Sequence, residues 1–203
     1  MTALRTQEHD LQKLPLGADD ITAAVEEDIV LGCLHPKERL VEEGLIERIK
    51  NRGAFVKAYL SKEVEDLYAM REILELAGAS SIPLPAPPKM IEELEDIHHR
   101  FIDALEHQDL RNVFRLNIAF HCALLSLTGK ALMFETIHEF AQKAHGIRFI
   151  GITNTINLMR ARDDHQAMID AIKQQDRAKR SELCRAHILP SKEIYLELIG
   201  KFR

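Results

Sequence analysis

The helical periodicity of apolar residues constrains the fold of this chain more than any other feature of its sequence. From Lys89 to the C-terminus only short polar breaks interrupt it, most clearly at Thr128-Gly129 and Gln175-Asp176. Pro190 is expected to kink or restart the last helix. The pattern predicts an antiparallel bundle of six or seven helices, with a first helix that Ser61 caps and others near residues 89–107, 109–128, 131–150, 155–174 and 177–199.

The composition is that of an ordinary globular protein of the cytosol. Apolar residues make up 46% of the 203 residues, which is enough for a sizeable core. No stretch reaches the roughly 18 to 20 uncharged apolar residues that a membrane span needs, and the N-terminus lacks the apolar core of a signal peptide. Three scattered cysteines (Cys33, Cys122 and Cys184) indicate reduced thiols. We therefore expect a cytoplasmic protein with no membrane partner.

A hairpin is predicted before the first helix of the bundle, over residues 45–57. Two short β-prone runs flank the turn Asn51-Arg52-Gly53 in the stretch GLIERIKNRGAFVKAYL. Its cationic side chains make it the most basic short stretch in the first third of the chain. The whole chain, by contrast, has a net charge of −5, which argues against nonspecific binding of nucleic acid by the entire molecule.

Two polar residues stand on an apolar helix face in the stretch LNIAFHCALL. Asn117 and His121 are four residues apart, so they point the same way, one helical turn above the other. Burial of an amide and an imidazole among apolar neighbours costs free energy unless both groups find a partner. A metal ion is one such partner.

Two further histidines have a symmetric arrangement. His165 and His187 lie at equal distances from Asp176, which falls in a predicted turn, so an antiparallel helix pair would place them side by side. A third helix could then add Asn117 and His121. Three imidazoles and one side-chain oxygen suit Zn²⁺, Ni²⁺ or a related divalent ion. Any one of these histidines alone would be read as an ordinary core residue, and the other seven are read as surface or local hydrogen-bonding residues: His9, His35, His98, His99, His107, His138 and His145.

Two arginines are candidates for binding a carboxylate. Arg71 lies on a mostly apolar helix, where it is either an exposed residue paired with Glu75 or a guanidinium that binds a carboxylate through two hydrogen bonds. Arg148, in the stretch GIRFIGI, presents the same two alternatives with less support. The spacing of the residues does not decide between them.

Several segments together resemble the GntR superfamily of bacterial transcription regulators, in its FadR branch with the FCD ligand-binding domain. The resemblance spans about residues 20–190 and rests on LHPKERLVEE, GLIERIKNRGAFV, MREILELAGA, NIAFHCALLSLTGK and DDHQAMIDAIKQQDRAKRSELCRAHI. It implies an N-terminal winged-helix DNA-binding domain, over residues 1–59, and an all-helical domain over residues 60–203. The second domain would bind a divalent metal and a small carboxylate effector.

The family's functional residues are carried over by position. Its metal ligands match Asn117, His121, His165 and His187, with Asn117 at a position that is usually Asp in the family. Because an amide oxygen brings no negative charge, the metal affinity is expected to be lower. Arg71 falls where the family has an arginine near the effector, Arg148 is the second effector candidate, and the wing that would contact DNA corresponds to Lys50, Asn51, Arg52 and Gly53.

One part of the family pattern is missing. The family places roughly two helices between the LVEE and GLI segments, and the second of them enters the major groove. Here Glu43 is followed directly by Gly44. Residues 1–57 hold eight Lys and Arg against eleven Asp and Glu, a net charge of −3, which makes a poor DNA surface. Either the intact protein contains a further segment at this point, or a natural deletion has removed it.

These features predict a dimeric, metabolite-responsive regulator that binds operator DNA and is not an enzyme. One alternative is a metal-dependent, hydrolase-like enzyme, because three histidines leave coordination positions open for water. Against it, Asp163 and Asp164 abut His165 but are expected to point elsewhere, so no general base is evident. The other alternative is a sensor or dimerisation partner that lacks the recognition helix. The effector, the operator and the direction of regulation do not follow from the residues.

Overall fold

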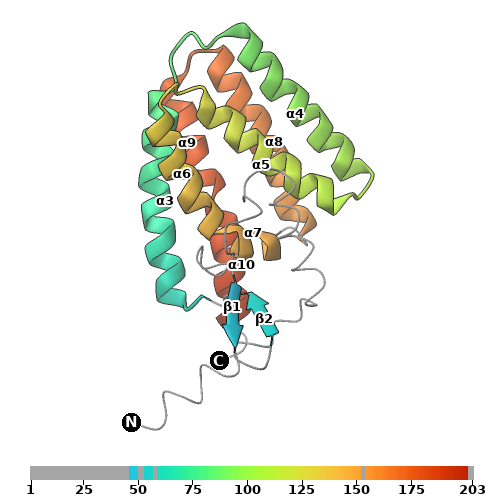
Figure 1. The fold of residues 1–203 in the computed structure, drawn as a ribbon. Helices are drawn as coiled ribbons and strands as arrows, with labels where there is room; N and C mark the ends of the chain where they lie inside the picture. Colours follow the sequence, from blue (N-terminus) through green and yellow to red (C-terminus); the bar gives the residue numbers. More distant parts are fainter. Residues whose placement is uncertain (1–45, 50–52, 57–58, 152–153, 201–203) are drawn as a thin grey trace.

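The computed structural model describes residues 46–49, 53–56, 59–151 and 154–200. Its elements are a two-stranded sheet and eight helices within these ranges (Figure 1). They are β1 (Ile46–Ile49), β2 (Gly53–Val56), α3 (Ser61–Ser81), α4 (Pro88–Glu106), α5 (Leu110–Ser126), α6 (Ala131–Lys143), α7 (His145–Gly151), α8 (Thr155–Lys173), α9 (Arg177–His187) and α10 (Leu189–Gly200). The predicted fold class, an all-α antiparallel bundle, is confirmed.

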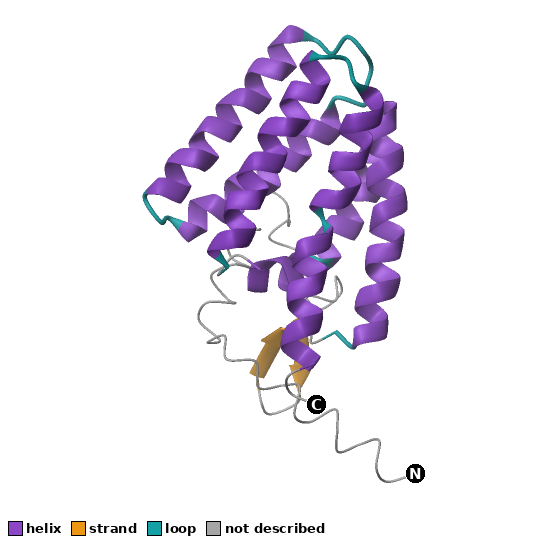
Figure 2. Ribbon diagram, turned by 180° about the vertical axis from the view of Figure 1, so that it is seen from behind, coloured by secondary structure: helices purple, strands orange, loops and turns teal. Residues whose placement is uncertain are grey.

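The predicted hairpin is also present. β1 and β2 are antiparallel and pair in a register that sets Ile46 opposite Val56 and Ile49 opposite Gly53. Gly53, one of the four predicted DNA-contacting residues, opens β2. The other three, Lys50, Asn51 and Arg52, lie outside the described residues, as does the rest of the predicted winged helix before β1. The hairpin stands at one end of the bundle, beside α10, in both ribbon views (Figures 1 and 2).

The long helices lie side by side and enclose one large core. α4 packs against α5 and α8, and α3 packs against α9 and α6. The core between them is made of fully buried apolar side chains, among them Leu94, Phe101, Phe120, Met168 and Ile169. No described helix has both the length and the apolar character that crossing a membrane would require.

Two of the predicted helices are each divided into two. The segment predicted over 131–150 is interrupted at Ala144, between α6 and α7, and the segment over 177–199 is interrupted at Ile188, between α9 and α10. Pro190 accounts for the second break, because proline is tolerated only in the first turn of a helix and here stands in the first turn of α10. The first break follows no Gly or Pro. The expected count of six or seven helices was therefore too low.

The starts of three helices have a clear sequence cause. Asp109, Asn154 and Asp176 each precede a helix and accept a hydrogen bond from the backbone N–H three residues later, at 3.1, 3.1 and 2.9 Å. Such caps satisfy one of the free N–H groups at a helix start. The cap at Asp176 fixes the turn between α8 and α9, and with it the register of the two helices that carry His165 and His187.

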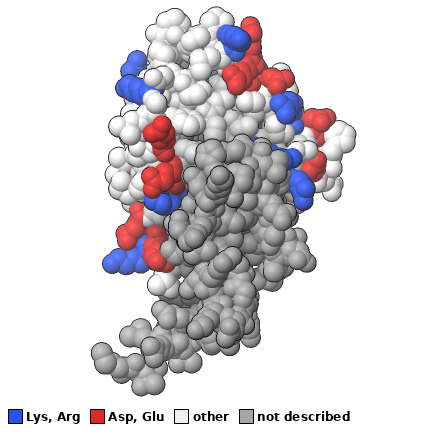
Figure 3. Space-filling model, in the orientation of Figure 1, with Lys and Arg blue, Asp and Glu red and all other residues white. Residues whose placement is uncertain are grey.

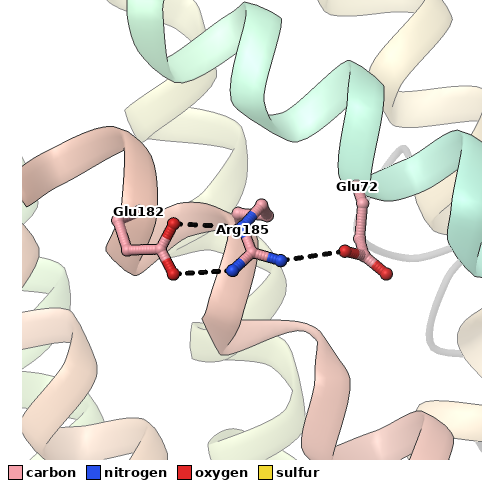
Figure 4. A network of polar contacts seen from close by, with 3 residues as sticks. All are labelled: Glu72, Glu182 and Arg185. Atoms are coloured by element: carbon pink, nitrogen blue, oxygen red, sulfur yellow. Dashed lines mark hydrogen bonds and ion pairs between the residues drawn. The ribbon is translucent and has the colours of Figure 1, made fainter. Parts of the chain in front are cut away.

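Two arginines of α9 attach this helix to α3. The guanidinium of Arg185 donates to both carboxylate oxygens of Glu182, at 3.0 and 2.6 Å, and to Glu72 of α3, at 3.1 Å (Figure 4). Arg180 is fully buried and donates to the carbonyl oxygens of Ala79 and Ile82, at 2.7 and 3.4 Å, at the C-terminal end of α3. These contacts hold α9 and α3 in a defined position on each side of the site described below.

Tyr59 connects the chain before α3 to two other helices of the bundle. Its backbone N–H donates to the hydroxyl of Tyr195 in α10, at 2.8 Å, and that hydroxyl donates in turn to the carbonyl oxygen of Tyr59, at 3.3 Å. The hydroxyl of Tyr59 donates to the carbonyl oxygen of Lys143, at the end of α6, at 2.8 Å. Tyr59, two residues before α3, is thus bound to α10 and to the end of α6.

Replacement of Gly78 by Ala is expected to lower the free energy of unfolding by about 1–3 kcal/mol. A Cβ at this position would lie 2.6 Å from Cδ1 of Ile137 and 3.0 Å from Cδ2 of Leu125, where α3 and α6 meet. The control is Gly200→Ala, because a Cβ there meets no atom within 4 Å. Urea denaturation measures both, and equal stability of the two variants would contradict the close α3–α6 contact.

Candidate metal centre

Three histidines from three helices converge inside the bundle. His121 lies on α5, His165 on α8 and His187 on α9, and one ring nitrogen of each lies within 4.8 Å of a ring nitrogen of the other two. Their ring centroids are 4.9 to 5.4 Å apart. The structure therefore brings together the two histidines that are symmetric about Asp176 and adds the histidine of the α5 pair. Three imidazoles this close can reach one divalent ion.

His165 is a buried polar residue without a hydrogen-bond partner. It is 0% exposed, and neither of its ring nitrogens makes a hydrogen bond. Its ring stacks on Phe120, with centroids 3.9 Å apart, and also lies near Phe101. A buried polar group with no partner costs roughly 1–3 kcal/mol. A metal ion between the three imidazoles would supply the missing partner of one nitrogen, so the residues present fit such an ion.

Asn117 lies beside the three histidines, one helical turn before His121. Its side-chain oxygen is buried and makes no hydrogen bond, and the residue lines the same cavity as His121 and His187. An amide oxygen with free lone pairs is a possible metal ligand. Asn117 thus lines the same cavity as two of the histidines, and its role as the fourth ligand stays a prediction.

Asp164 is a site residue that the sequence reasoning missed. Its Oδ2 accepts a hydrogen bond from Nδ1 of His187, at 3.0 Å, and both residues line the cavity. The expectation that Asp164 points elsewhere on its helix was wrong. A carboxylate commonly orients a metal-ligating histidine in this way, and it leaves Nε2 free for the metal. The symmetry about Asp176 contained the signal, because it places Asp164 opposite Ile188, next to His187.

The cavity beside the histidines has a cationic wall. Arg71, Arg148 and Arg160 all line it, and the space that water can occupy is about 70 Å³. Arg71 is only 4% exposed and lies over the ring of Tyr68. One of its terminal nitrogens donates to Glu75, at 3.3 Å, while Nε and the other terminal nitrogen make no hydrogen bond. Arg71 thus pairs with Glu75, as one alternative expected, but it is buried rather than exposed. Binding of a carboxylate by Arg71 stays a prediction.

Comparison with known proteins identifies the family. The model of the FCD domain matches residues 66–189, which is more than half of the chain. The chain belongs to the FCD domain family. The part of the GntR resemblance that rests on this domain is therefore confirmed.

Individual relatives agree with the family. The FCD chain is 26% identical over 149 residues to an uncharacterized HTH-type transcriptional regulator in an unstable DNA locus of Streptomyces ambofaciens, a match that covers 73% of this chain and 62% of that protein. The fold is shared with a putative GntR transcriptional regulator from Rhodococcus sp. RHA1, at 20% identity, TM-score 0.64 and coverage of 99% and 96% of the two chains. It is also shared with E. coli McbR/YncC, at 16% identity, TM-score 0.63 and coverage of 90% and 95%. The relatives named as regulators are not enzymes, in line with the expectation from the sequence.

Two other histidines of the FCD domain differ from expectation. His98 and His145, which were read as surface or local hydrogen-bonding residues, are 1% and 5% exposed. His98 lies next to the site, with its ring centroid 5.9 Å from that of His165. Burial lowers the pKa of His98, so this residue adds no positive charge to the surroundings of His165 near neutral pH. No signal in the sequence separated these two histidines from the exposed ones.

Burial also keeps two of the site histidines neutral. The pKa values of His121 and His165 lie well below the ordinary 6.5, first because burial removes water from the charged form and then because His187 lies close by. Neutral imidazoles are the form that binds a metal. The apo FCD domain is therefore ready to bind a metal at neutral pH without losing protons from these two residues.

The metal-free FCD domain is expected to lose stability as the pH falls below 6.5. In that range the unfolded chain protonates the imidazoles of His121 and His165, but the folded chain does not, so the unfolded state binds more protons and gains free energy. Each histidine that stays neutral in the folded chain contributes a loss of at most about 1.4 kcal/mol per pH unit below 6.5. Urea denaturation of chelator-treated protein over this range measures it.

The control for this measurement is the same series on a His165→Leu variant. Removal of the imidazole of His165 should lower the slope of stability against pH, while His121 and His98 keep contributing to it. A slope that is unchanged by the substitution would mean that His165 is protonated equally in the folded and unfolded states.

Proposed function

We propose that this chain is a metabolite-responsive transcription regulator of the GntR type, whose helical domain binds one divalent metal ion and a small carboxylate effector. The metal would be Zn²⁺ or Ni²⁺, held by Asn117, His121, His165 and His187. Three imidazoles and one neutral oxygen suit these ions and leave coordination positions open. The observation that carries the proposal is the pair of unpartnered nitrogens on fully buried His165, within reach of two more imidazoles.

The cationic wall supports an acidic effector. Arg71 presents two nitrogens that make no hydrogen bond, and Arg148 and Arg160 line the same cavity. A guanidinium can bind a carboxylate through two parallel hydrogen bonds, which sets its orientation as well as its affinity. The water-accessible space of about 70 Å³ holds about five water molecules, so the acid would be a small one.

Each residue of the site has its own part in this proposal. When bound, the metal ion would act as a Lewis acid that attracts a carboxylate oxygen of the effector. Arg71 and Arg148 would bind the same carboxylate or a second one, and Asp164 would keep the ring of His187 in the orientation that directs Nε2 inward. Glu75 would balance the buried charge of Arg71 when no effector is present.

The DNA-binding part of the proposal assigns residues 1–59 to a winged helix and residues 60–203 to the sensor. Lys50, Asn51, Arg52 and Gly53 would form the wing that contacts DNA, and a two-fold dimer would bind a two-fold operator. The chain spans about 62% of the length of its Streptomyces relative. The gene-derived sequence around Glu43 and Gly44 decides whether the intact protein also contains a recognition helix at this point.

Metal analysis tests the proposal directly. Protein purified without a histidine tag is analysed for metals before and after treatment with a chelator, and the chelated protein is then titrated with Zn²⁺ and with Ni²⁺. We expect one divalent ion per chain and a stabilisation of about 2.7 kcal/mol when the metal concentration is 100 times Kd. A protein that takes up neither ion and gains no stability from them would overturn the metal site.

A further inference from the structure

The two faces of α4 differ in character, and His98 lies on the face that should be apolar. Glu92, Asp96 and Arg100 are exposed on the outer face, and Figure 3 shows acidic and basic side chains along the upper right edge of the molecule, where Figure 1 places α4. The buried residues of the inner face are Leu94, Ile97, His98, Phe101 and Ala104. His98 is the one polar member of this buried set, so it requires a partner inside the bundle.

His98 and His165 are adjacent, and both have ring nitrogens without a partner. Nδ1 of His98 makes no hydrogen bond with any described residue, and the same holds for both ring nitrogens of His165. The two ring centroids are 5.9 Å apart. Buried polar atoms without a partner are uncommon, because each has lost its hydrogen bonds to water and gained none in return. Two such residues side by side can satisfy each other.

A metal ion would meet only half of the need of His165. A neutral imidazole that binds a metal through one nitrogen carries its proton on the other, and this N–H group requires an acceptor. Within the described part of the chain, the rings around His165 are those of His98, Phe101, Phe120, His121 and His187. The phenylalanines have no polar atom, and two of the histidines are themselves ligands of the proposed site. Among these rings, His98 is the one that can accept the hydrogen bond.

Another histidine of the site already has a partner of this kind. Asp164 accepts a hydrogen bond from Nδ1 of His187, at 3.0 Å. Such partners fix the orientation of a metal-binding imidazole and raise the metal affinity. His98 can do the same for His165 when its own proton is on Nε2, because Nδ1 then has a free lone pair.

A small movement would bring the two rings into hydrogen-bond contact. An N–H···N hydrogen bond of roughly 3 Å places two imidazole centroids roughly 5 Å apart. The centroids of His98 and His165 therefore have to approach by about 1 Å from their present 5.9 Å. The torsion that turns a histidine ring about its Cβ–Cγ bond is soft, so the side chains can make this adjustment without a change of the helices.

We infer that His98 is a positioning residue of the metal centre, whose Nδ1 accepts a hydrogen bond from the ring N–H of metal-bound His165. The inference rests on the proposed function, because it requires a bound metal. It adds a fourth helix to the site: α5, α8 and α9 carry the three histidines, and this contact would attach α4 to them. Metal binding would then join α4 to α8 through a polar contact as well as through apolar packing.

Titration of the chelator-treated full chain with Zn²⁺, in competition with a coloured chelator, tests the inference. His98→Leu removes the acceptor and keeps the side-chain size, so we expect Zn²⁺ binding to weaken by about 10- to 100-fold. His98→Asn should restore most of the affinity, because Oδ1 of asparagine takes nearly the place of Nδ1 of histidine. The control is His99→Leu, the same change at the next residue, which is exposed and should bind Zn²⁺ like the wild type.

The outcomes separate this inference from the metal site itself. Equal Zn²⁺ affinity of His98→Leu and His99→Leu, or an His98→Asn variant as weak as His98→Leu, would overturn the role of His98 and leave the metal site in place. A wild-type chain that binds no Zn²⁺ would overturn both. Urea denaturation of the metal-free variants shows whether folding is intact, and His98→Leu should be at least as stable as the wild type because it removes a buried nitrogen without a partner.

NMR spectra of the zinc-loaded, ¹⁵N-labelled wild type provide a second test that needs no variant. The nitrogen chemical shifts report which atom of each imidazole ring carries the proton. We expect the proton of His98 on Nε2, and one nitrogen of His165 protonated while the other binds the metal. A proton on Nδ1 of His98 would overturn the inference, because that nitrogen could not then accept a hydrogen bond.

Discussion

Replacement of His165 by Leu is expected to abolish metal binding and, at the same time, to stabilise the metal-free protein. Leu is close to His in size but has no polar atoms, so it removes two buried nitrogens that make no hydrogen bond. The expected gain in the free energy of unfolding is about 1–3 kcal/mol, which is the cost of an unsatisfied buried polar group. Loss of one ligand should lower the metal affinity by more than the roughly 10- to 100-fold that changes to outer-shell partners produce. Urea denaturation and calorimetric titration with Zn²⁺ measure the two effects.

A loss of metal binding together with a gain in stability of the metal-free protein distinguishes a metal ligand from a core residue. If His165 were only part of the core, its replacement by Leu would change the stability of the protein equally with and without added metal. The matched control is His99→Leu, because His99 is exposed on α4 and should change neither quantity. Asn117→Asp should act in the other direction and tighten metal binding, because it replaces a neutral oxygen with a charged one. A loss of metal affinity in Asn117→Asp would remove this residue from the ligand set.

Removal of the guanidinium of Arg71 is expected to weaken effector binding by about 10- to 150-fold, which corresponds to roughly 1.5–3 kcal/mol for a charge-assisted contact. Arg71→Ala alone would leave the buried carboxylate of Glu75 without its partner. The informative variant is therefore the double substitution Arg71→Met with Glu75→Gln, in which neither side chain keeps a charge. Calorimetric titration of the metal-loaded protein with a series of small mono- and dicarboxylic acids measures the affinity.

The control for this experiment is Glu75→Gln alone. It keeps the guanidinium and removes only its internal partner, so it should bind the acids at least as tightly as the wild type. If the double variant and the control bind equally well, Arg71 is a structural ion-pair residue and the effector contacts must lie elsewhere on the cavity wall.

The site could be predicted largely from the sequence because its geometry follows from one turn. Asp176 caps α9 and thereby fixes the register of α8 and α9, so two residues equidistant from it must lie side by side. The same reasoning, carried one residue further, would have placed Asp164 at His187. It was missed because Asp164 was considered only on its own helix. Arg71 illustrates the opposite case, since burial of an arginine depends on how α3 packs against other helices, which no local pattern records.

The fold was predictable to the same degree. Long stretches with a helical periodicity of apolar residues predict the helices, and Gly129 and Asp176 mark turns that the structure contains. The break at Ala144 was not predictable, because it depends on tertiary packing: Ala144 and Ile147 are fully buried in a second apolar cluster with Tyr195. Packing of this kind overrides the local preference for a continuous helix.

The hydrogen bonds of Tyr59 connect the start of α3 to α10, the helix that follows the site residue His187. His187 ends α9, and Tyr195, eight residues later on α10, is bound to the backbone of Tyr59 through both its N–H and its carbonyl group. Rotation of α10 about its axis must therefore either carry the start of α3 with it or break a hydrogen bond. The junction is, in mechanical terms, a stiff coupling rather than a hinge.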